Sequence, residues 1–193
     1  MKTIPNAGPF PVLGDNQVHV WFLDLRASQN VCDALLPQGF LSIDELERHS
    51  RYIFQRDRDT YLICRSVFRL ILSQYLHLHP THIQFEYNQY GKPSINLACC
   101  KTMIQFNPSH SDQNALFAFA CGTEVGIDIE RIDETVECDS LVTTVFSERE
   151  LIEYHSLPPQ NRQRSFYSAW TRKEAVIKAI GHGLSIPPTS FSV

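Results

Sequence analysis

The sequence predicts an α+β protein, in which strands and helices occur in separate runs along the chain. Residues 18–25 (VHVWFLDL) are rich in β-branched and aromatic side chains, which favours a strand. Residues 58–76 instead repeat apolar side chains on one helical face. Strand-like segments return at 83–87 and 115–120. The first part of the chain is therefore expected to form a strand, then helices, then further strands.

The composition is that of an ordinary globular chain. Its 193 residues are 43% hydrophobic and 20% charged, with a net charge of −4 that argues against broad nucleic-acid binding. No apolar run approaches the roughly 20 residues of a membrane span, and no signal-peptide pattern is present. The six cysteines form no CxxC pair, which favours free thiols in a reducing compartment. We expect a cytoplasmic protein without nucleic-acid or membrane partners.

The predicted helices of the first part carry charges where apolar residues are expected. Ser42 and Glu45 have the spacing of a capping box, so a helix should begin there. In the helix at 58–76, Arg65 lies among apolar side chains on the helical wheel. Its stem could follow the core while the guanidinium reaches water, or the arginine could serve a ligand. The residues alone leave both interpretations open.

A turn is expected after the strand at 83–87. Residues 88–93 (NQYGKP) place Gly91 before Lys92 and Pro93, so the backbone is exposed and Lys92 is held extended. This pattern alone indicates a hairpin loop.

A polar loop is expected at 107–111 (NPSHS), between a strand at 103–106 and the strand at 115–120. The hydroxyl of Ser109 and the imidazole of His110 could donate to an anion from such a loop. Loops of this composition are also common as simple turns.

A boundary near residues 121–124 divides the chain into halves at 1–121 and 122–193. The second half is expected to contain, in order, a strand at 124–132, a short helix opened by the Ser147–Glu150 capping box, a loop at 158–164, a helix at 166–180 ended by Gly181, and a turn with the start of a strand at 184–193.

The second half gathers charges that need partners. In a strand, the period of two puts Asp128 and Glu130 on one face. In the helix, Glu174 lies at the edge of the apolar stripe, Lys173 lies inside it, and Lys178 follows Glu174 by one turn. Buried charges are costly unless something compensates them.

A divalent cation would join these elements. Two strand carboxylates and Glu174 form a hard oxygen site that suits Mg²⁺ better than zinc. Each piece alone is better explained by a solvated strand face or by an exposed ion pair. The carboxylates and the nearby basic residues together predict a Mg²⁺-assisted transfer that involves a pyrophosphate or phosphate ester. No P-loop, dinucleotide fingerprint or nucleophile elbow is present, so the enzyme classes that those motifs mark lose support. The basic residues available for phosphate oxygens are Arg65, Lys92, His110, Lys173 and Lys178.

Five ordered motifs resemble one family. The series YGKP, FNPSHS, GIDIE, WTRKEAVIK and GHGLSIP is similar to that of 4′-phosphopantetheinyl transferases of the surfactin-synthetase-activating (Sfp) type. The resemblance implies an α+β monomer of two similar halves related by a pseudo-twofold, with coenzyme A held between them. It implies a holo-(acyl-carrier-protein) synthase that needs Mg²⁺, moves the phosphopantetheine arm of coenzyme A to a serine of an apo acyl, peptidyl or aryl carrier protein, and releases 3′,5′-ADP. Such enzymes serve fatty acid, polyketide and nonribosomal peptide biosynthesis.

The resemblance also implies roles for individual residues. The Mg²⁺ ligands would be Asp128, Glu130 and Glu174. The coenzyme A contacts would be Lys178 at the pyrophosphate, Ser109 and His110 at phosphates, Gly91, Lys92 and Pro93 at the adenine, and Arg65 at the 3′-phosphate. Glu174 and Lys178 would then act in catalysis.

Three further assignments are less direct. Arg51, Arg56 and Arg58 are all candidates for another coenzyme A contact, and Arg56 is chosen among them. Glu150 matches a family glutamate proposed as a catalytic base, although its capping role accounts for it as well. Lys173 is either a phosphate contact or a stem that follows the core.

The chain departs from the family in one respect. Family members continue for some tens of residues beyond the SFSV segment, so either the sequence stops short of the natural end or the second sheet lacks edge strands, which would expose unpaired backbone. Two alternative functions remain at this point: a relative that binds coenzyme A without transfer, and another Mg²⁺-dependent phosphotransferase.

Overall fold

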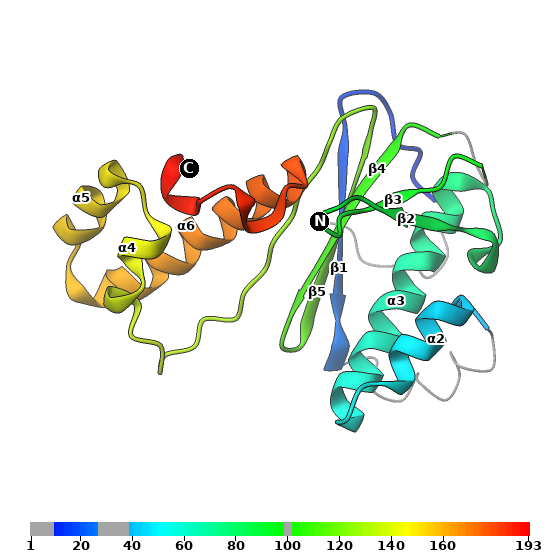
Figure 1. Cartoon of the computed structure of the whole chain (residues 1–193), viewed down its shortest axis with the longest axis horizontal. Helices are drawn as coiled ribbons and strands as arrows, with labels where there is room; N and C mark the ends of the chain where they lie inside the picture. Colours follow the sequence, from blue (N-terminus) through cyan, green and yellow to red (C-terminus); the bar gives the residue numbers. More distant parts are fainter. Residues whose placement is uncertain (1–9, 27–38, 99–101) are drawn as a thin grey trace.

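A computed structural model describes residues 10–26, 39–98 and 102–193 of the chain, and it confirms the α+β prediction. A three-stranded antiparallel sheet lies between helical regions on its two sides (Figure 1). None of the helices in the described part is both long and apolar enough to cross a membrane. Three free thiols are described, at Cys64, Cys121 and Cys138, and the other three cysteines lie outside the described residues.

The sheet consists of β1 (Val18–Asp24), β4 (Ile104–Ser111) and β5 (Asn114–Cys121), in the order β1-β5-β4. The central strand, β5, is apolar on both faces because both faces are covered. Phe106 pairs with Phe119, so alternate residues of β4 and β5 face α3, while those between them face the other side.

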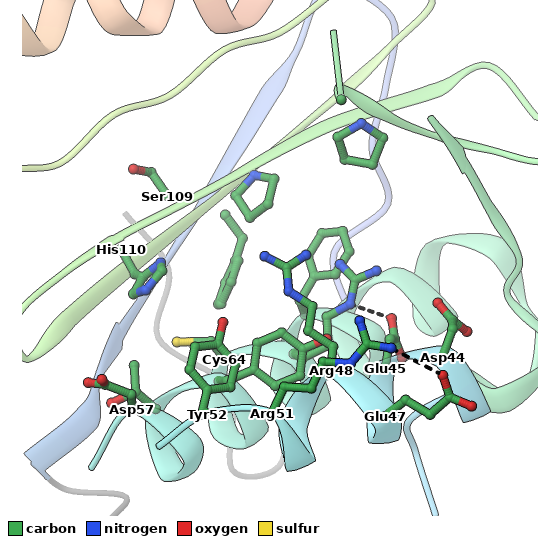
Figure 2. Close-up of a pocket in the computed structure, with 18 of the residues that line it drawn as sticks. Asp44, Glu45, Glu47, Arg48, Arg51, Tyr52, Asp57, Cys64, Ser109 and His110 are labelled. Atoms are coloured by element: carbon green, nitrogen blue, oxygen red, sulfur yellow. Dashed lines mark hydrogen bonds and ion pairs between the residues drawn. The ribbon is translucent and has the colours of Figure 1, made fainter. Parts of the chain in front are cut away.

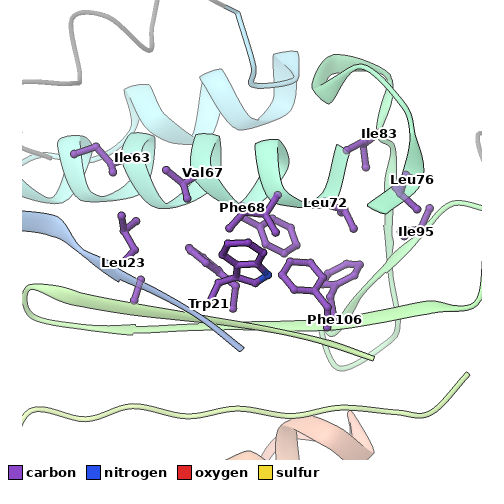
Figure 3. Close-up of a cluster of buried hydrophobic side chains, with 14 of the residues drawn as sticks. Trp21, Leu23, Ile63, Val67, Phe68, Leu72, Leu76, Ile83, Ile95 and Phe106 are labelled. Atoms are coloured by element: carbon purple, nitrogen blue, oxygen red, sulfur yellow. The ribbon is translucent and has the colours of Figure 1, made fainter. Parts of the chain in front are cut away.

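Helix α3 (Gln55–Leu76) covers the first face and builds the main core (Figure 3). The ring centroid of Phe68 lies 5.1 Å from that of Phe106 and 5.8 Å from those of Phe117 and Phe119. Offset and tilted rings at these distances attract one another in addition to the apolar area they bury. The helix begins three residues before its predicted start and ends where predicted.

Two small elements flank this core. Helix α2 (Ile43–Ser50) begins at the predicted capping box and packs beside α3. The hairpin of β2 (Phe85–Tyr87) and β3 (Pro93–Ile95) encloses the predicted turn, in which Gly91 has a φ of 85°. A left-handed backbone of this kind favours glycine.

The predicted loop at 107–111 is wrong, because these residues belong to β4. Pro108 has no amide proton to donate, but β4 is an edge strand of the sheet, where a proline is tolerated. A tight turn then leads into β5, with Asp112 at a φ of 51°.

The second sheet face receives an extended segment instead of a helix. Small side chains at Ala118 and Ala120 pack there against Val125 and Ile127. The predicted strand at 124–132 is wrong in one respect: the segment is extended, but in the described structure it pairs with no other strand. Its contacts are instead with α6 and with side chains of β4.

Residues 122–193 otherwise form helices: α4 (Val142–Val145), α5 (Glu148–Ser156) and α6 (Pro159–Ile180). Their separate core contains Cys138, Val142, Val145, Phe146, Tyr154 and Phe166.

Two further predictions in this part are wrong. The loop expected at 158–164 is the first turn of α6, since Pro159 occupies a position where a missing amide proton costs nothing. The strand start expected at 184–193 is replaced by 3₁₀ turns at Gly183–Ser185 and Pro188–Ser190. The predicted end of α6 at Gly181 is confirmed, with a φ of 77°.

Gly126 should be intolerant of any side chain. A Cβ atom there would lie 1.9 Å from Ala175 O and 2.4 Å from Ala179 N, both backbone atoms of α6. We expect Gly126→Ala to lower the free energy of unfolding by about 1–3 kcal/mol, as overpacking does in other cores. Gly14→Ala is the control, because its Cβ would meet only the flexible side chain of Gln17. Equal urea-unfolding curves for the two variants would contradict this packing.

Candidate functional site

Two adjoining cavities lie where the sheet, the β2–β3 hairpin and α6 meet. The larger, of about 800 Å³, is bounded by α2, α3 and β4 (Figure 2). The smaller, of about 240 Å³, lies between the hairpin turn and the end of α6. Gly91, Pro93 and Pro108 line both, so the two cavities share a wall.

The larger cavity has a cationic and aromatic wall. Arg48 and Arg51 reach it from α2 and its end, beside Tyr52 and Tyr61 (Figure 2). The guanidinium of Arg48 lies 5.6 Å from the ring centroid of Tyr61, and the two tyrosine rings are 5.3 Å apart. The sequence prediction missed Arg48 and left Arg51 as one of several alternatives. The spacing of three, which puts both on one side of α2, was the available signal.

Arg65 is fixed in this wall by a buried carboxylate. Glu45 is 3% exposed and accepts hydrogen bonds from Nε of Arg65 and from Nε of Arg69, the latter at 2.6 Å. The guanidinium of Arg65 also lies 4.4 Å from the ring centroid of Phe85. Burial alone would raise the pKa of Glu45, but the two arginines and the Ser42 amide hold it below its ordinary value. Arg65 is therefore an anchored part of the cavity wall.

Successive residues of β4 point to opposite faces of the sheet beside the two cavities. His110 lies on the α3 side and lines the larger cavity (Figure 2). Loss of hydration there, together with the charge of Lys178, lowers the pKa of His110. Ser109 lies on the opposite side, where α6 and the extended segment pack.

Ser109, Asp128 and Lys178 form a closed triangle of hydrogen bonds. The ammonium of Lys178 donates to Asp128 Oδ1 at 2.5 Å and to Ser109 Oγ at 3.1 Å. Ser109 Oγ in turn donates to Asp128 Oδ1 at 2.9 Å. The side chain of Asp128 is 3% exposed, and its Oδ2 is buried with no hydrogen-bond partner among the described residues. A buried carboxylate oxygen of this kind is costly unless a ligand supplies the missing contact.

The three predicted Mg²⁺ ligands influence one another electrostatically. Burial raises the pKa of Glu174, and the charges of Asp128 and Glu130 raise it further, against the effect of Lys178. An all-oxygen set with a buried, unpartnered Oδ2 suits a hard divalent cation. Within the described ranges, however, no group of three or more His, Cys, Asp or Glu side chains is placed to hold a metal ion. The ammonium of Lys178 supplies the positive charge beside Asp128 in this arrangement.

The hairpin turn is tied to the end of α6. Lys92 Nζ donates to Ala179 O at 2.6 Å and pairs with Glu124. Asn88 Nδ2 donates to Gly181 O at 2.8 Å. These bonds bring the turn to the smaller cavity, which Glu174 and Lys178 also line.

Arg56 lies outside both cavities. Its guanidinium pairs with Asp112 in the β4–β5 turn, and it lines a separate cavity of about 530 Å³. The position therefore gives no support to the predicted coenzyme A contact.

Lys173 and Glu150 lie within the second core. Lys173 is 0% exposed, and its Nζ lies 2.7 Å from Glu150 Oε2. Nζ also donates to the carbonyls of Pro188, at 2.8 Å, and Phe191, so its three protons are engaged. Burial alone would raise the pKa of Glu150, but Lys173 and the Ser147 amide hold it below its ordinary value. This position corrects the predicted phosphate contact of Lys173 and does not favour Glu150 as a base.

Two family models match the chain. The model described as 4′-phosphopantetheinyl transferase superfamily matches residues 124–193. The model described as 4′-phosphopantetheinyl transferase, N-terminal, matches residues 33–121. The two matches meet at the boundary between the main core and the second core.

Several curated proteins are similar to most of the chain. The 4′-phosphopantetheinyl transferase HetI of Nostoc sp. is 34% identical over 94% of this chain and 76% of its own length. Gsp of Aneurinibacillus migulanus is 36% identical over 78% of this chain and 60% of its own length. Sfp of Bacillus subtilis is 30% identical over 89% of this chain and 73% of its own length. The chain thus spans between 60% and 76% of the length of these relatives.

Removing the Glu45 charge should destabilise the cavity wall. Glu45→Gln leaves the buried guanidinium of Arg69 and the partly buried guanidinium of Arg65 without their carboxylate, and removal of one partner of a buried ion pair typically costs about 3–5 kcal/mol. The exposed pair of Arg51 and Glu47 provides the control, since Glu47→Gln should cost less than about 1 kcal/mol. Urea unfolding at pH 7 measures both, and similar losses in the two variants would refute the structural role of Glu45.

The effect of Glu45 should also depend on pH. Its pKa in the folded protein lies below the ordinary value of 4.5, so its stabilisation is complete above about pH 4.5. It is lost as the pH falls through the folded-state pKa. The stability difference between the natural protein and Glu45→Gln should therefore shrink in acid, and a difference that stayed constant down to pH 2 would contradict the assignment.

Proposed function

The chain belongs to the 4′-phosphopantetheinyl transferase superfamily, and from this we propose that it moves the phosphopantetheine arm of coenzyme A to a serine of an apo carrier protein, with Mg²⁺, releasing 3′,5′-ADP. One observation carries the proposal. Residues of the YGKP, SHS and WTRKEAVIK motifs line two adjoining cavities, and Asp128 of GIDIE bonds to two of them.

The cavities offer what a phosphate-rich ligand needs. The larger has three arginines in its wall, and the smaller has Lys92 and Lys178. The volume of the larger cavity, about 800 Å³, is within the usual range of ligand sites, roughly 300–1,000 Å³. Coenzyme A would thus lie along the shared wall, with the hairpin turn at its adenine and Arg65 at its 3′-phosphate.

Asp128, Glu130 and Glu174 are the residues that would hold Mg²⁺. They are hard oxygen donors with more negative charge than Lys178 can balance, and Asp128 Oδ2 has no hydrogen-bond partner within the described part of the chain. When bound, the ion would neutralise the charge that develops on the pyrophosphate.

The chain itself provides orientation and a proton acceptor. The carrier serine attacks the phosphorus next to the pantetheine, its oxygen bonds to that phosphorus, and the bond to 3′,5′-ADP breaks. Lys178 and His110 would hold phosphate oxygens in line for this displacement. A carboxylate of this site would accept the serine proton.

Finer points belong to the same proposal. Identity to HetI is higher than identity to Sfp, so the Sfp type is an inference from the motifs and not from the comparisons. The monomeric state, the cytoplasmic location and the choice among acyl, peptidyl and aryl carriers likewise stay predictions.

The test is to incubate the protein with coenzyme A, an apo carrier protein and Mg²⁺, and to weigh the carrier. We expect the carrier to gain the mass of phosphopantetheine, and the gain to stop when EDTA removes Mg²⁺. Binding of coenzyme A without a mass gain would indicate a relative that binds but does not transfer. Neither binding nor gain would point to another phosphotransferase.

Single substitutions should separate the site from the fold. Asp128→Ala and Glu174→Ala should each slow transfer at least about 100-fold, because each removes a proposed metal ligand. Glu153→Ala is the control, as it removes an exposed carboxylate of α5 that pairs with Arg149 and lines neither cavity. Circular dichroism checks that each variant is folded, and normal transfer by either site variant would refute the metal assignment.

A further inference from the structure

Polar side chains on one face of β4 bind the segment that carries the carboxylates, here named the carboxylate segment (residues 126–131). Alternate residues of a strand point the same way, so Asn107, Ser109 and Ser111 lie on the face that the carboxylate segment covers. Four hydrogen bonds join the two: Ile127 N to Asn107 Oδ1 at 3.0 Å, Ser109 Oγ to Asp128 Oδ1 at 2.9 Å, Ser111 Oγ to Glu130 Oε2 at 2.8 Å, and Arg131 N to Ser111 Oγ at 3.0 Å.

These bonds have a regular register. Each joins residues that are 19 or 20 apart in the sequence, so the carboxylate segment runs parallel to β4 along the length of the contact. No backbone ladder connects the carboxylate segment to a strand of the described structure. The side chains of β4 therefore set the register that a backbone ladder would set in a sheet.

Ser111 has the most specific position in this contact. Its hydroxyl donates to the carboxylate of Glu130 and accepts from the amide of Arg131, the next residue. It thus fixes both the side chain and the backbone of the carboxylate segment at that point. Glu130 is exposed, so this hydrogen bond contributes more than packing does to the position of its carboxylate.

We propose that Ser111 is a positioning residue for a shared divalent cation. Together with Asn107, which lies two residues before Ser109 on the same face of β4, it orients the carboxylates of Glu130 and Asp128 toward that cation. The proposal rests on the proposed function, because it takes these carboxylates as metal ligands. When a group that orients a metal ligand by a hydrogen bond is removed, metal affinity typically falls 10- to 100-fold. Ser111 acts through Glu130, whereas a contact to coenzyme A would act on the substrate.

Metal binding without turnover tests the proposal. Binding of Mn²⁺, measured by electron paramagnetic resonance in the absence of coenzyme A, should weaken by about 10- to 100-fold in Ser111→Ala. Ser111→Thr keeps the hydroxyl and should restore affinity to within about threefold of the natural protein. Ser94→Ala is a matched control, since Ser94 also donates to a glutamate, Glu86, but on the β2–β3 hairpin. It should leave Mn²⁺ affinity unchanged.

A second measurement separates the alternatives. Calorimetric binding of coenzyme A without metal should be the same in Ser111→Ala and in the natural protein. A loss of coenzyme A binding with unchanged Mn²⁺ affinity would assign Ser111 to the substrate and overturn the proposal. A lower melting temperature with unchanged Mn²⁺ affinity would show that the hydrogen bond of Ser111 only stabilises the fold, and it would also overturn the proposal.

The natural protein distinguishes this failure from failure of the proposed function. If it binds no Mn²⁺, the proposed metal site and the positioning role are both refuted. If it binds Mn²⁺ and transfers nothing to a carrier, only the transfer is refuted. If it binds Mn²⁺ and Ser111→Ala binds it equally well, only the positioning role is refuted.

Discussion

The packing of the carboxylate segment between the sheet and α6 is the constraint on which the site depends. On one side, Gly126 allows the backbone to touch α6 at Ala175 and Ala179. On the other, small residues of β5 leave room for the carboxylate segment, and polar residues of β4 bind it. This double contact brings Asp128 to Lys178, and the lysine lines the smaller cavity. A bulkier residue on either side would separate them.

Buried charges support the two halves in similar ways. In the first, Glu45 joins α2 to α3 through Arg65 and Arg69 and sets the position of the cavity wall. In the second, Lys173 and Glu150 join α6 to α5 and to the carbonyls of Pro188 and Phe191. Each of these charges has an oppositely charged partner, and removal of one partner of a buried ion pair is strongly destabilising. Two charges that looked like ligand contacts in the sequence, Arg65 and Lys173, thus both have structural partners, and only Arg65 also faces a cavity.

The sequence predicted the helix ends that local residue patterns mark, and it missed the features that depend on contacts between residues far apart in the chain. Capping boxes at Ser42 and Ser147 and the glycine after α6 were correct, because these signals act within a few residues. The strand identity of residues 107–111 was missed because only the sheet order makes Pro108 an edge residue. The carbonyl partners of Lys173 could not be predicted for the same reason. They lie 15 and 18 residues away along the chain and reach the lysine only through the fold. Asp128 and Glu130 were identified from a strand periodicity, and the segment proved to be extended but to pair with no strand of the described structure. Glu174 and Lys178 were identified from helical periodicity, which α6 confirms.

The contacts that close the site are far apart along the chain, and this bears on the order in which the protein forms. Lys178 meets Asp128 across 50 residues and Ser109 across 69, and Asn88 meets Gly181 across 93. Loop-closure entropy opposes such contacts until neighbouring structure is already in place. During synthesis the strands, α3 and the arginine wall can assemble first, since domains generally fold from the N-terminal side as they emerge. The lysine that completes the site arrives on α6, so a nascent chain has a formed core well before it has a site.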